Sequence, residues 1–220
     1  MLKVAIVILN WNGKAILKRF LPSVVANSGI DGAEVIVADN GSEDDSISFL
    51  ENFFPEVKII PLEKNYGFAE GYNRALTQVE AEFFVLLNSD VEVTPGWLAP
   101  LIECMERDNL IAACMPKILS AERHDLFEYA GAAGGFIDQY GYPFCQGRIF
   151  NSLETDYGQF NKSRDIFWAS GACFMVRGAL FKLTGGLDPD FFAHMEEIDL
   201  CWKIKNRGYR IVYEPLSVVY

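Results

Sequence analysis

Short apolar runs alternate with stretches of helical spacing over the first hundred residues. Aliphatic and β-branched residues form four runs of strand length, at Val4–Leu9, Val35–Ala38, Val57–Leu62 and Phe83–Leu87. Between these runs, apolar residues recur every three or four positions, which is the spacing of an amphipathic helix. Three helices are predicted in this way, over Lys14–Val25, Ser46–Phe53 and Phe68–Val79. Continuously apolar strands separated by helices are typical of a mostly parallel sheet covered on both faces, so the pattern predicts the α/β class.

Further elements follow the fourth strand. Thr94-Pro95 is a typical helix start, with Thr94 as N-cap, and Ser42 is the expected N-cap of the helix at Ser46–Phe53. Residues 120–165 are rich in Gly, Tyr, Phe and Asp without a long helical pattern, which indicates β-hairpins and loops. The other predictions are strands at Ile111–Met115, Ala172–Val176 and Arg210–Tyr213, and helices at Gly178–Leu183 and Glu196–Asn206.

Composition and charge narrow the class of partner. The chain has 220 residues, half of them hydrophobic, which suffices for one sizeable core. Its 19 basic and 30 acidic residues give a net charge of −11, which argues against nucleic acid as the partner. An anionic small ligand stays open, because a metal ion or helix N-termini can supply positive charge locally.

The cysteines and the N-terminus bear on location. Five cysteines, none of them in CxxC spacing, argue against a disulfide framework or a zinc site and favour a reducing cytoplasm. Val4–Leu9 is too short for a secretory signal, and no run reaches the length of a membrane span. We therefore expect the protein to lie in the cytoplasm, either free or at the inner face of the cell membrane.

Polar residues follow each of the four early strands. The strand ends are Asn10, Asp39-Asn40-Gly41-Ser42, Asn65-Tyr66-Gly67 and Asn88-Ser89-Asp90. In a parallel sheet these ends share one edge, and ligands bind in the crevice outside it. Turn formation explains most of the residue choice at Asn40-Gly41 and Asn12-Gly13, but it explains Asp39 and Asp90 less well. No GxGxxG or GxxxxGK[ST] motif follows a strand, which disfavours dinucleotide oxidoreductases and excludes P-loop nucleotidases.

Six stretches together resemble glycosyltransferase family 2, of the GT-A fold, in particular its bacterial rhamnosyltransferase-like members. They come in the family's order and span nearly the whole chain: Val7–Gly13, Val37–Ser42, Asn65–Asn73, Leu86–Asp90, Gly185–Phe192 and Glu196–Leu200. The resemblance implies one GT-A domain over residues 1–220, with a nucleotide-binding half (1–115) and an acceptor and catalytic half (116–220) that includes a smaller β region.

The resemblance also implies roles for the strand-end residues. Asp39 would accept a hydrogen bond from a pyrimidine N–H, Asn10 would line the base and ribose pocket, and Gly67 and Asn73 would pack on the nucleotide. Asn88-Ser89-Asp90 stands in place of the family's DxD motif. Asp90 is then the expected ligand of Mn²⁺ or Mg²⁺, while Asn88 offers a neutral oxygen or a hydrogen bond to the sugar.

On the acceptor side, Glu196-Glu197-Ile198-Asp199 stands in place of the family's Glu-Asp-x-Asp motif, which makes Glu197 the expected catalytic base beside Glu196. A simpler explanation of these acidic residues is that they lie in the first turn of a helix, where negative charge complements the helix dipole. Trp168 and Gly171 lie in a stretch that resembles the acceptor segment, where Trp168 would stack on a sugar ring. Related enzymes often carry a metal-binding histidine just beyond a segment like Leu216–Tyr220, so we expect a chain truncated at the C-terminus.

These features predict an inverting glycosyltransferase that moves a sugar from a UDP- or dTDP-sugar to a hydroxyl of a saccharide or lipid-linked saccharide, in cell-surface polysaccharide synthesis. One alternative is a domain or fragment that binds nucleotide sugars without catalysis. Another is a nucleotidyltransferase of related topology. The latter requires a glycine-rich, lysine-bearing loop after the first strand, which Asn12-Gly13-Lys14 matches poorly.

Overall fold

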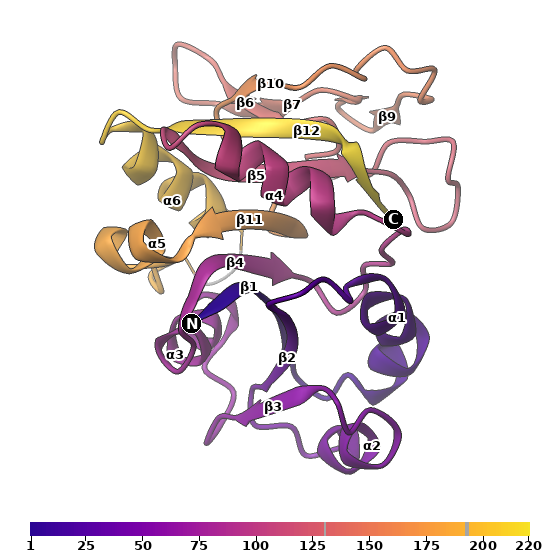
Figure 1. Ribbon diagram of the computed structural model, residues 1–220. Helices are drawn as coiled ribbons and strands as arrows, with labels where there is room; N and C mark the ends of the chain where they lie inside the picture. Colours follow the sequence, from indigo (N-terminus) through magenta and orange to yellow (C-terminus); the bar gives the residue numbers. More distant parts are fainter. Residues whose placement is uncertain (130, 192–193) are drawn as a thin grey trace.

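The structure is a computed structural model that describes residues 1–129, 131–191 and 194–220. Within these residues the largest sheet has eight strands in the order β10-β12-β5-β11-β4-β1-β2-β3 (Figure 1). Its strands are β1 (Leu2–Asn10), β2 (Ala33–Asp39), β3 (Lys58–Pro61), β4 (Ala81–Leu87), β5 (Ile111–Ile118), β10 (Arg164–Ile166), β11 (Cys173–Arg177) and β12 (Arg210–Val219).

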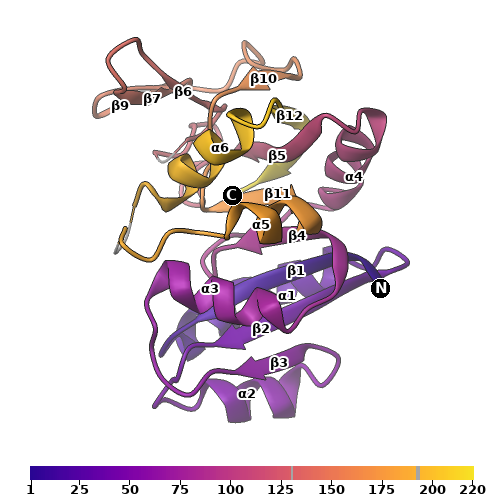
Figure 2. The ribbon, with the colours of Figure 1, turned by 90° about the vertical axis from the view of Figure 1, so that its left-hand side faces the viewer.

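The helices cover both faces of this sheet. In Figures 1 and 2, α1 and α2 lie on one face of the β1–β4 region, and α3 and α5 lie on the other. Val4–Ile8 of β1 and Phe83–Leu87 of β4 are almost completely buried between these layers, which explains why their sequences are apolar without alternation. The helices are α1 (Lys14–Asn27), α2 (Ser46–Phe53), α3 (Phe68–Thr77), α4 (Leu98–Arg107), α5 (Gly178–Thr184) and α6 (Glu196–Lys205).

Parallel pairing brings the ends of β1, β2 and β4 to one edge. Asn10 stands directly opposite Asp39 in the register of β1 and β2, and Ile8 of β1 stands opposite Leu87 of β4. β11 is inserted antiparallel between β4 and β5. The predicted α/β class with a mostly parallel sheet is confirmed. The direction and place of β11 could not be read from its sequence, because a buried strand is equally apolar in either orientation.

Small hairpins fill residues 120–165, as predicted. β6 (Gly135–Ile137) pairs with β7 (Pro143–Cys145), and β8 (Arg148–Ile149) pairs with β9 (Ser152–Leu153). They lie beyond β12 and beside β10, at the opposite end of the molecule from α2 (Figure 1). No helix among the described residues is both long and apolar enough for a membrane crossing.

Two predicted helix caps are wrong. The hydroxyl of Ser42 donates to Asp39 Oδ1 at 2.6 Å, and α2 begins after Asp45. The hydroxyl of Thr94 donates to the carbonyl of Val218, and α4 begins after Trp97. The hydroxyl of Ser42 is thus used by a carboxylate three residues earlier in the same loop, and that of Thr94 by a strand far away in the sequence.

The last strand is longer than predicted. β12 continues from Arg210 to Val219 through a register shift between Glu214 and Val218. The irregular stretch contains Pro215, which interrupts the strand pattern in the sequence. Pairing with β5 on both sides of the irregularity keeps the strand in the sheet.

Candidate functional site

A buried polar pair closes the end of β1 and β2. Asn10 Nδ2 donates to Asp39 Oδ1 at 2.9 Å, and both residues are only 1% exposed. Asp39 Oδ2 also accepts a hydrogen bond from the backbone N–H of Ser42. These bonds fix the Asp39 carboxylate against the loop that follows β2. Asn10 Oδ1 is buried and has no hydrogen-bond partner among the residues that the structure describes.

A cavity of about 490 Å³ opens beside this pair. Asp39 lines it together with Trp11, Lys64 and the loop at residues 41–43. Trp11 is 57% exposed although it is a large aromatic residue, so its ring is available at the cavity. Trp11 is not among the site residues predicted from the sequence. Its position directly after the polar end of a buried strand is the signal that could have found it.

The start of α3 forms the next part of the crevice. Gly67, with φ of +80°, precedes the first helical residue, and it lines a second cavity of about 440 Å³ with Lys64 and Phe191. Asn40 holds this loop in place, because its Nδ2 donates to the carbonyl of Gly67 and its Oδ1 accepts from the N–H of Tyr66. The N-terminus of α3 therefore borders the same edge as Asn10 and Asp39.

Asn73 bonds to protein backbone. Its Nδ2 donates to the carbonyl of Leu187 at 2.7 Å, and its Oδ1 accepts from the N–H of the same residue. A Cβ atom on Gly186 would lie 2.3 Å from Asn73 Oδ1, so only glycine fits there. Asn73 thus positions the segment around Leu187 against α3. The family-like stretch Gly185–Phe192 ends on Phe192, which lies outside the described residues.

Asn88-Ser89-Asp90 leaves the end of β4 as a turn. The carbonyl of Leu87 accepts a hydrogen bond from the buried hydroxyl of Tyr72 at 3.0 Å, which holds the base of the turn. Asp90 is exposed, and Asn88 and Ser89 are half-buried. Over the described part of the chain, no three His, Cys, Asp or Glu side chains gather into a metal-binding group. A metal ion here would have one carboxylate ligand, Asp90, and neutral oxygens beside it.

Glu196 and Glu197 open α6 with buried carboxyl groups. One oxygen of each, Oε2, is buried without a hydrogen-bond partner among the described residues. Burial, and secondarily the charge of Glu196, raises the pKa of Glu197 to about 7. Burial also raises the pKa of Glu196. Met195, directly before the helix, has a φ of +79° and turns the chain into it.

β11 brings the acidic pair close to the Asn88 turn. A Cβ atom built on Gly171 would lie 3.8 Å from Glu197 Cδ, so Gly171 packs directly against this carboxyl group. The next residue, Ala172, accepts a hydrogen bond at its carbonyl from the N–H of Asn88 at 2.9 Å. Glu197 and the Asn88–Asp90 turn are therefore neighbours across the 171–172 segment.

Trp168 is not placed for stacking on a sugar. Its side chain is buried, with 7% exposure, and its Nε1 donates to the carbonyl of Phe136 at 2.9 Å. A Cβ atom on Gly135 would lie 2.0 Å from its ring, so the glycine allows the indole to pack against β6. Trp168 supports the hairpin region as a core residue.

Sequence comparison gives the family. The profile described as "Glycosyl transferase family 2" matches residues 5–184. The N-acetylglucosaminyl-diphospho-decaprenol L-rhamnosyltransferase of Mycobacterium tuberculosis is 27% identical, over 92% of this chain and 70% of that protein. The low-salt glycan biosynthesis hexosyltransferase Agl10 of Haloferax volcanii is 24% identical, over 94% of this chain and 63% of that protein.

Solved structures share the fold. GalNAc-T7 with UDP, GalNAc and Mn²⁺ superposes with a TM-score of 0.76 at 20% identity, over all of this chain and 43% of that one. The mannosyltransferase PcManGT from Pyrobaculum calidifontis, in complex with GDP-Man and Mn²⁺, has a TM-score of 0.70 at 17% identity, over 99% of this chain and 56% of that one. The expected GT-A fold is confirmed, and the chain belongs to glycosyl transferase family 2 as a glycosyltransferase domain.

Proposed function

We propose that this domain transfers a sugar from a UDP- or dTDP-sugar to an acceptor hydroxyl with inversion at the anomeric carbon. The observation that carries the proposal is the position of the buried Glu197 carboxyl group. It packs against Gly171, and the next residue, Ala172, is hydrogen-bonded to Asn88 in the turn that bears Asp90. Inverting transfer needs a proton acceptor on one side of the anomeric carbon and stabilisation of the leaving diphosphate on the other. Glu197 and Asp90 supply these two groups.

The nucleoside end of the donor fits the cavity beside Asp39. Asp39 Oδ1 accepts hydrogen bonds from Asn10 Nδ2 and Ser42 Oγ, and Oδ2 accepts one from the N–H of Ser42, so Oδ2 keeps capacity for a pyrimidine N–H. Trp11 offers an exposed aromatic face on which a base can stack. Asn10 Oδ1, which has no hydrogen-bond partner among the described residues, suits a donor group of the base or ribose.

The diphosphate of the donor fits the edge of the sheet at the carboxyl ends of the strands, between Gly67 and Asp90. The N–H groups at the start of α3 have no side-chain cap from Gly67, and such a helix N-terminus favours an anion. Asp90, with the neutral oxygens of Asn88 and Ser89, is a donor set that suits Mn²⁺ or Mg²⁺, since such ions bind through one or two carboxylates together with substrate phosphates. When bound, the ion supplies positive charge against the leaving diphosphate. PcManGT and GalNAc-T7 were both solved with Mn²⁺.

Glu197 acts as the base in a single displacement. Its carboxylate takes the proton of the acceptor hydroxyl, the hydroxyl oxygen bonds to the anomeric carbon, and the bond from that carbon to the diphosphate oxygen breaks. A pKa of about 7 suits a general base at neutral pH, because both the ionised fraction and the proton affinity are then substantial. The thiols nearest this region, Cys173 and Cys201, are buried, and burial raises the pKa of both, so neither is an activated nucleophile.

We infer the class of acceptor from the names of two relatives. The mycobacterial relative is named for an N-acetylglucosaminyl-diphospho-decaprenol acceptor, and Agl10 is named for glycan biosynthesis. A saccharide or lipid-linked saccharide acceptor, used in cell-surface polysaccharide synthesis on the cytoplasmic side of the membrane, is consistent with both names.

Two variants test the proposal. Calorimetry with UDP and dTDP, with and without Mn²⁺, should show metal-dependent binding to the parent. Glu197→Gln should keep that binding and lose sugar transfer, and Asp90→Ala should lose the metal dependence. Glu103→Gln, an exposed carboxylate on α4, is the matched control and should behave as the parent. Unimpaired transfer by Glu197→Gln would move the base elsewhere. Metal-dependent binding without transfer by the parent would make the chain a donor-binding domain.

A further inference from the structure

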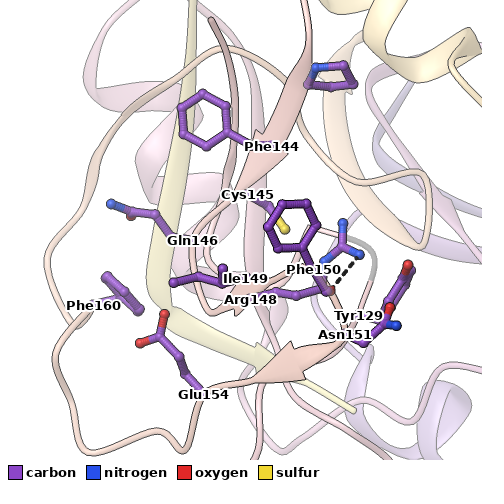
Figure 3. Close-up of a pocket in the computed structure, with 11 residues that line it drawn as sticks. Tyr129, Phe144, Cys145, Gln146, Arg148, Ile149, Phe150, Asn151, Glu154 and Phe160 are labelled. Atoms are coloured by element: carbon purple, nitrogen blue, oxygen red, sulfur yellow. Dashed lines mark hydrogen bonds between the residues drawn. The ribbon is translucent and has the colours of Figure 1, made fainter.

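The hairpin region contains a cavity of about 600 Å³ that shares no residue with the donor crevice (Figure 3). Its lining comes from β7, β8, the turn between β8 and β9, and the loops around Tyr129 and Phe160. Pockets of this size are ordinary for small-molecule ligands. Nothing in the mechanism proposed above uses these residues.

The lining combines aromatic faces with a polar rim. Tyr129, Phe144 and Phe150 are each at least half exposed, and Gln146, Asn151 and Glu154 surround them. Figure 3 shows Tyr129 and Asn151 on one side of the cavity and Glu154 on the other. A sugar ring has an apolar C–H face and a rim of hydroxyl groups, so it matches such a lining. The two charged lining residues, Arg148 and Glu154, have opposite signs, which favours an uncharged ligand.

Most of the aromatic walls are held in place before any ligand binds. The guanidinium carbon of Arg148 lies 3.8 Å from the centre of the Tyr129 ring. Phe144 stacks on Phe136 with ring centres 5.7 Å apart. Phe160 contacts Phe127 at 5.5 Å. Fixed walls reduce the entropy lost on binding, as expected of a binding site.

Phe150 is not part of the hydrophobic core that the described residues form. It is 89% exposed and has a φ of +51°, a conformation that costs a bulky residue about 1–3 kcal/mol. Ile149 pairs with Ser152, so Phe150 is the first residue of a two-residue hairpin turn, a site where glycine is favoured. An exposed phenyl group on strained backbone costs folding free energy, which points to a role in binding.

The hairpin is connected to the catalytic base through Trp168. The N–H of Gly135 donates to the carbonyl of Trp168, and Gly135 pairs with Cys145, which lines the cavity. Two strand spacings of about 4.8 Å, three residues from Trp168 to Gly171 and the contact between Gly171 and Glu197 place the cavity within about 25 Å of the Glu197 carboxyl group. An extended chain of several sugars can span a separation of this order.

We propose that the cavity between Tyr129, Phe144 and Phe150 binds uncharged sugar units of the acceptor at a distance from the hydroxyl that reacts. This inference rests on the proposed transferase function, and it makes the acceptor an oligosaccharide with two points of attachment. The cavity supplies affinity for the distal sugars, while the crevice beside Glu197 holds the reacting one.

Calorimetry without donor tests the cavity separately from catalysis. Neutral chito-, malto- and rhamno-oligosaccharides, from disaccharide to hexasaccharide, are titrated into the parent, Phe150→Gly, Tyr129→Ala and the control Phe53→Ala. Phe53 is a 70% exposed phenylalanine on α2, outside the cavity. The parent should bind the longer members of at least one series. Loss of a stacking ring should weaken that binding about tenfold in Phe150→Gly and Tyr129→Ala, and Phe53→Ala should match the parent.

Phe150→Gly also separates binding from folding. Glycine removes the ring and suits the turn, so the Tm of this variant should equal or exceed that of the parent. Equal saccharide binding by the parent and Phe150→Gly, or no saccharide binding by the parent, overturns the inference. Binding of the parent to neutral phosphatidylcholine vesicles, lost in Phe150→Gly without any saccharide binding, assigns the surface to a membrane and also overturns it. Absence of donor turnover contradicts the transferase proposal and leaves the calorimetric result intact.

Discussion

Replacing Glu197 by glutamine should stabilise the folded protein above pH 7 while it removes the proposed base. Two effects oppose each other at this carboxyl group. The N-terminus of α6 favours the ionised form, typically by about 0.3–1 kcal/mol. Burial and the charge of Glu196 disfavour it, and they prevail, because the pKa of Glu197 is raised from 4.5 to about 7. The folded protein therefore binds the Glu197 proton more tightly than the unfolded chain does.

The size and direction of the effect follow from linkage. Each pH unit between the unfolded and folded pKa values is worth about 1.4 kcal/mol, so the difference between 4.5 and about 7 corresponds to about 3 kcal/mol. Below pH 4.5 the carboxyl group is protonated in both the folded and the unfolded protein, so it does not lower the free energy of unfolding. Between pH 4.5 and 7 the group ionises only in the unfolded chain, so the free energy of unfolding falls with rising pH. This loss is complete above pH 7. Glutamine has no proton to lose and avoids this loss.

Urea unfolding at pH 5 and pH 8 measures the effect. From pH 5 to pH 8, the free energy of unfolding of Glu197→Gln should rise relative to the parent by about 2–3 kcal/mol. The exposed control Glu103→Gln should show no such change relative to the parent. A pH-independent difference between Glu197→Gln and the parent would show that the carboxyl group is not held in its neutral form by burial, and the argument for a base with a raised pKa would be lost.

Three further predictions concern other parts of the chain. Trp11→Ala should weaken UDP binding by about 1–3 kcal/mol in calorimetry, since base stacking has this magnitude; an unchanged Kd would remove Trp11 from the base site. Lys117→Met should lower the free energy of unfolding by about 3–5 kcal/mol, because Asp156, its 2.6 Å ion-pair partner, stays buried without a counter-charge. Adding Asp156→Leu should restore most of this loss, and a further loss would show that the pair is not coupled. Asn73→Ala should speed hydrogen exchange at the N–H of Leu187, and protection equal to the parent would mean that another group holds this segment.

The sequence predicted the architecture well in its first half because the information there is local. The buried parts of β1 and β4, Val4–Ile8 and Phe83–Leu87, are apolar at every position, and the helices between these strands repeat apolar residues at helical spacing. The polar residues at the strand ends were also found this way. Asn10 and Asp39 meet in the structure because parallel pairing aligns the ends of neighbouring strands.

Trp11 and Trp168 show that the local sequence does not predict which tryptophan side chain is buried. Trp11 and Trp168 both lie beside a strand, yet Trp11 is 57% exposed and Trp168 is 7% exposed. Sequence reasoning gave the sugar-stacking role to Trp168, which packs against β6 instead. The packing partner of Trp168 is Gly135, more than thirty residues away, and no local pattern indicates that contact.

The sequence by itself determined the α/β class, the positions of most strands and helices, and the set of polar strand ends, because hydrophobic periodicity and turn chemistry act over a few residues. Only the tertiary structure decided that β11 runs antiparallel between β4 and β5. That placement joins Ala172 to Asn88 and sets Gly171 against Glu197, so it brings the proposed base to the turn that bears Asp90. These contacts link residues far apart in the chain, and the packing of the whole sheet, which no local pattern encodes, selects them.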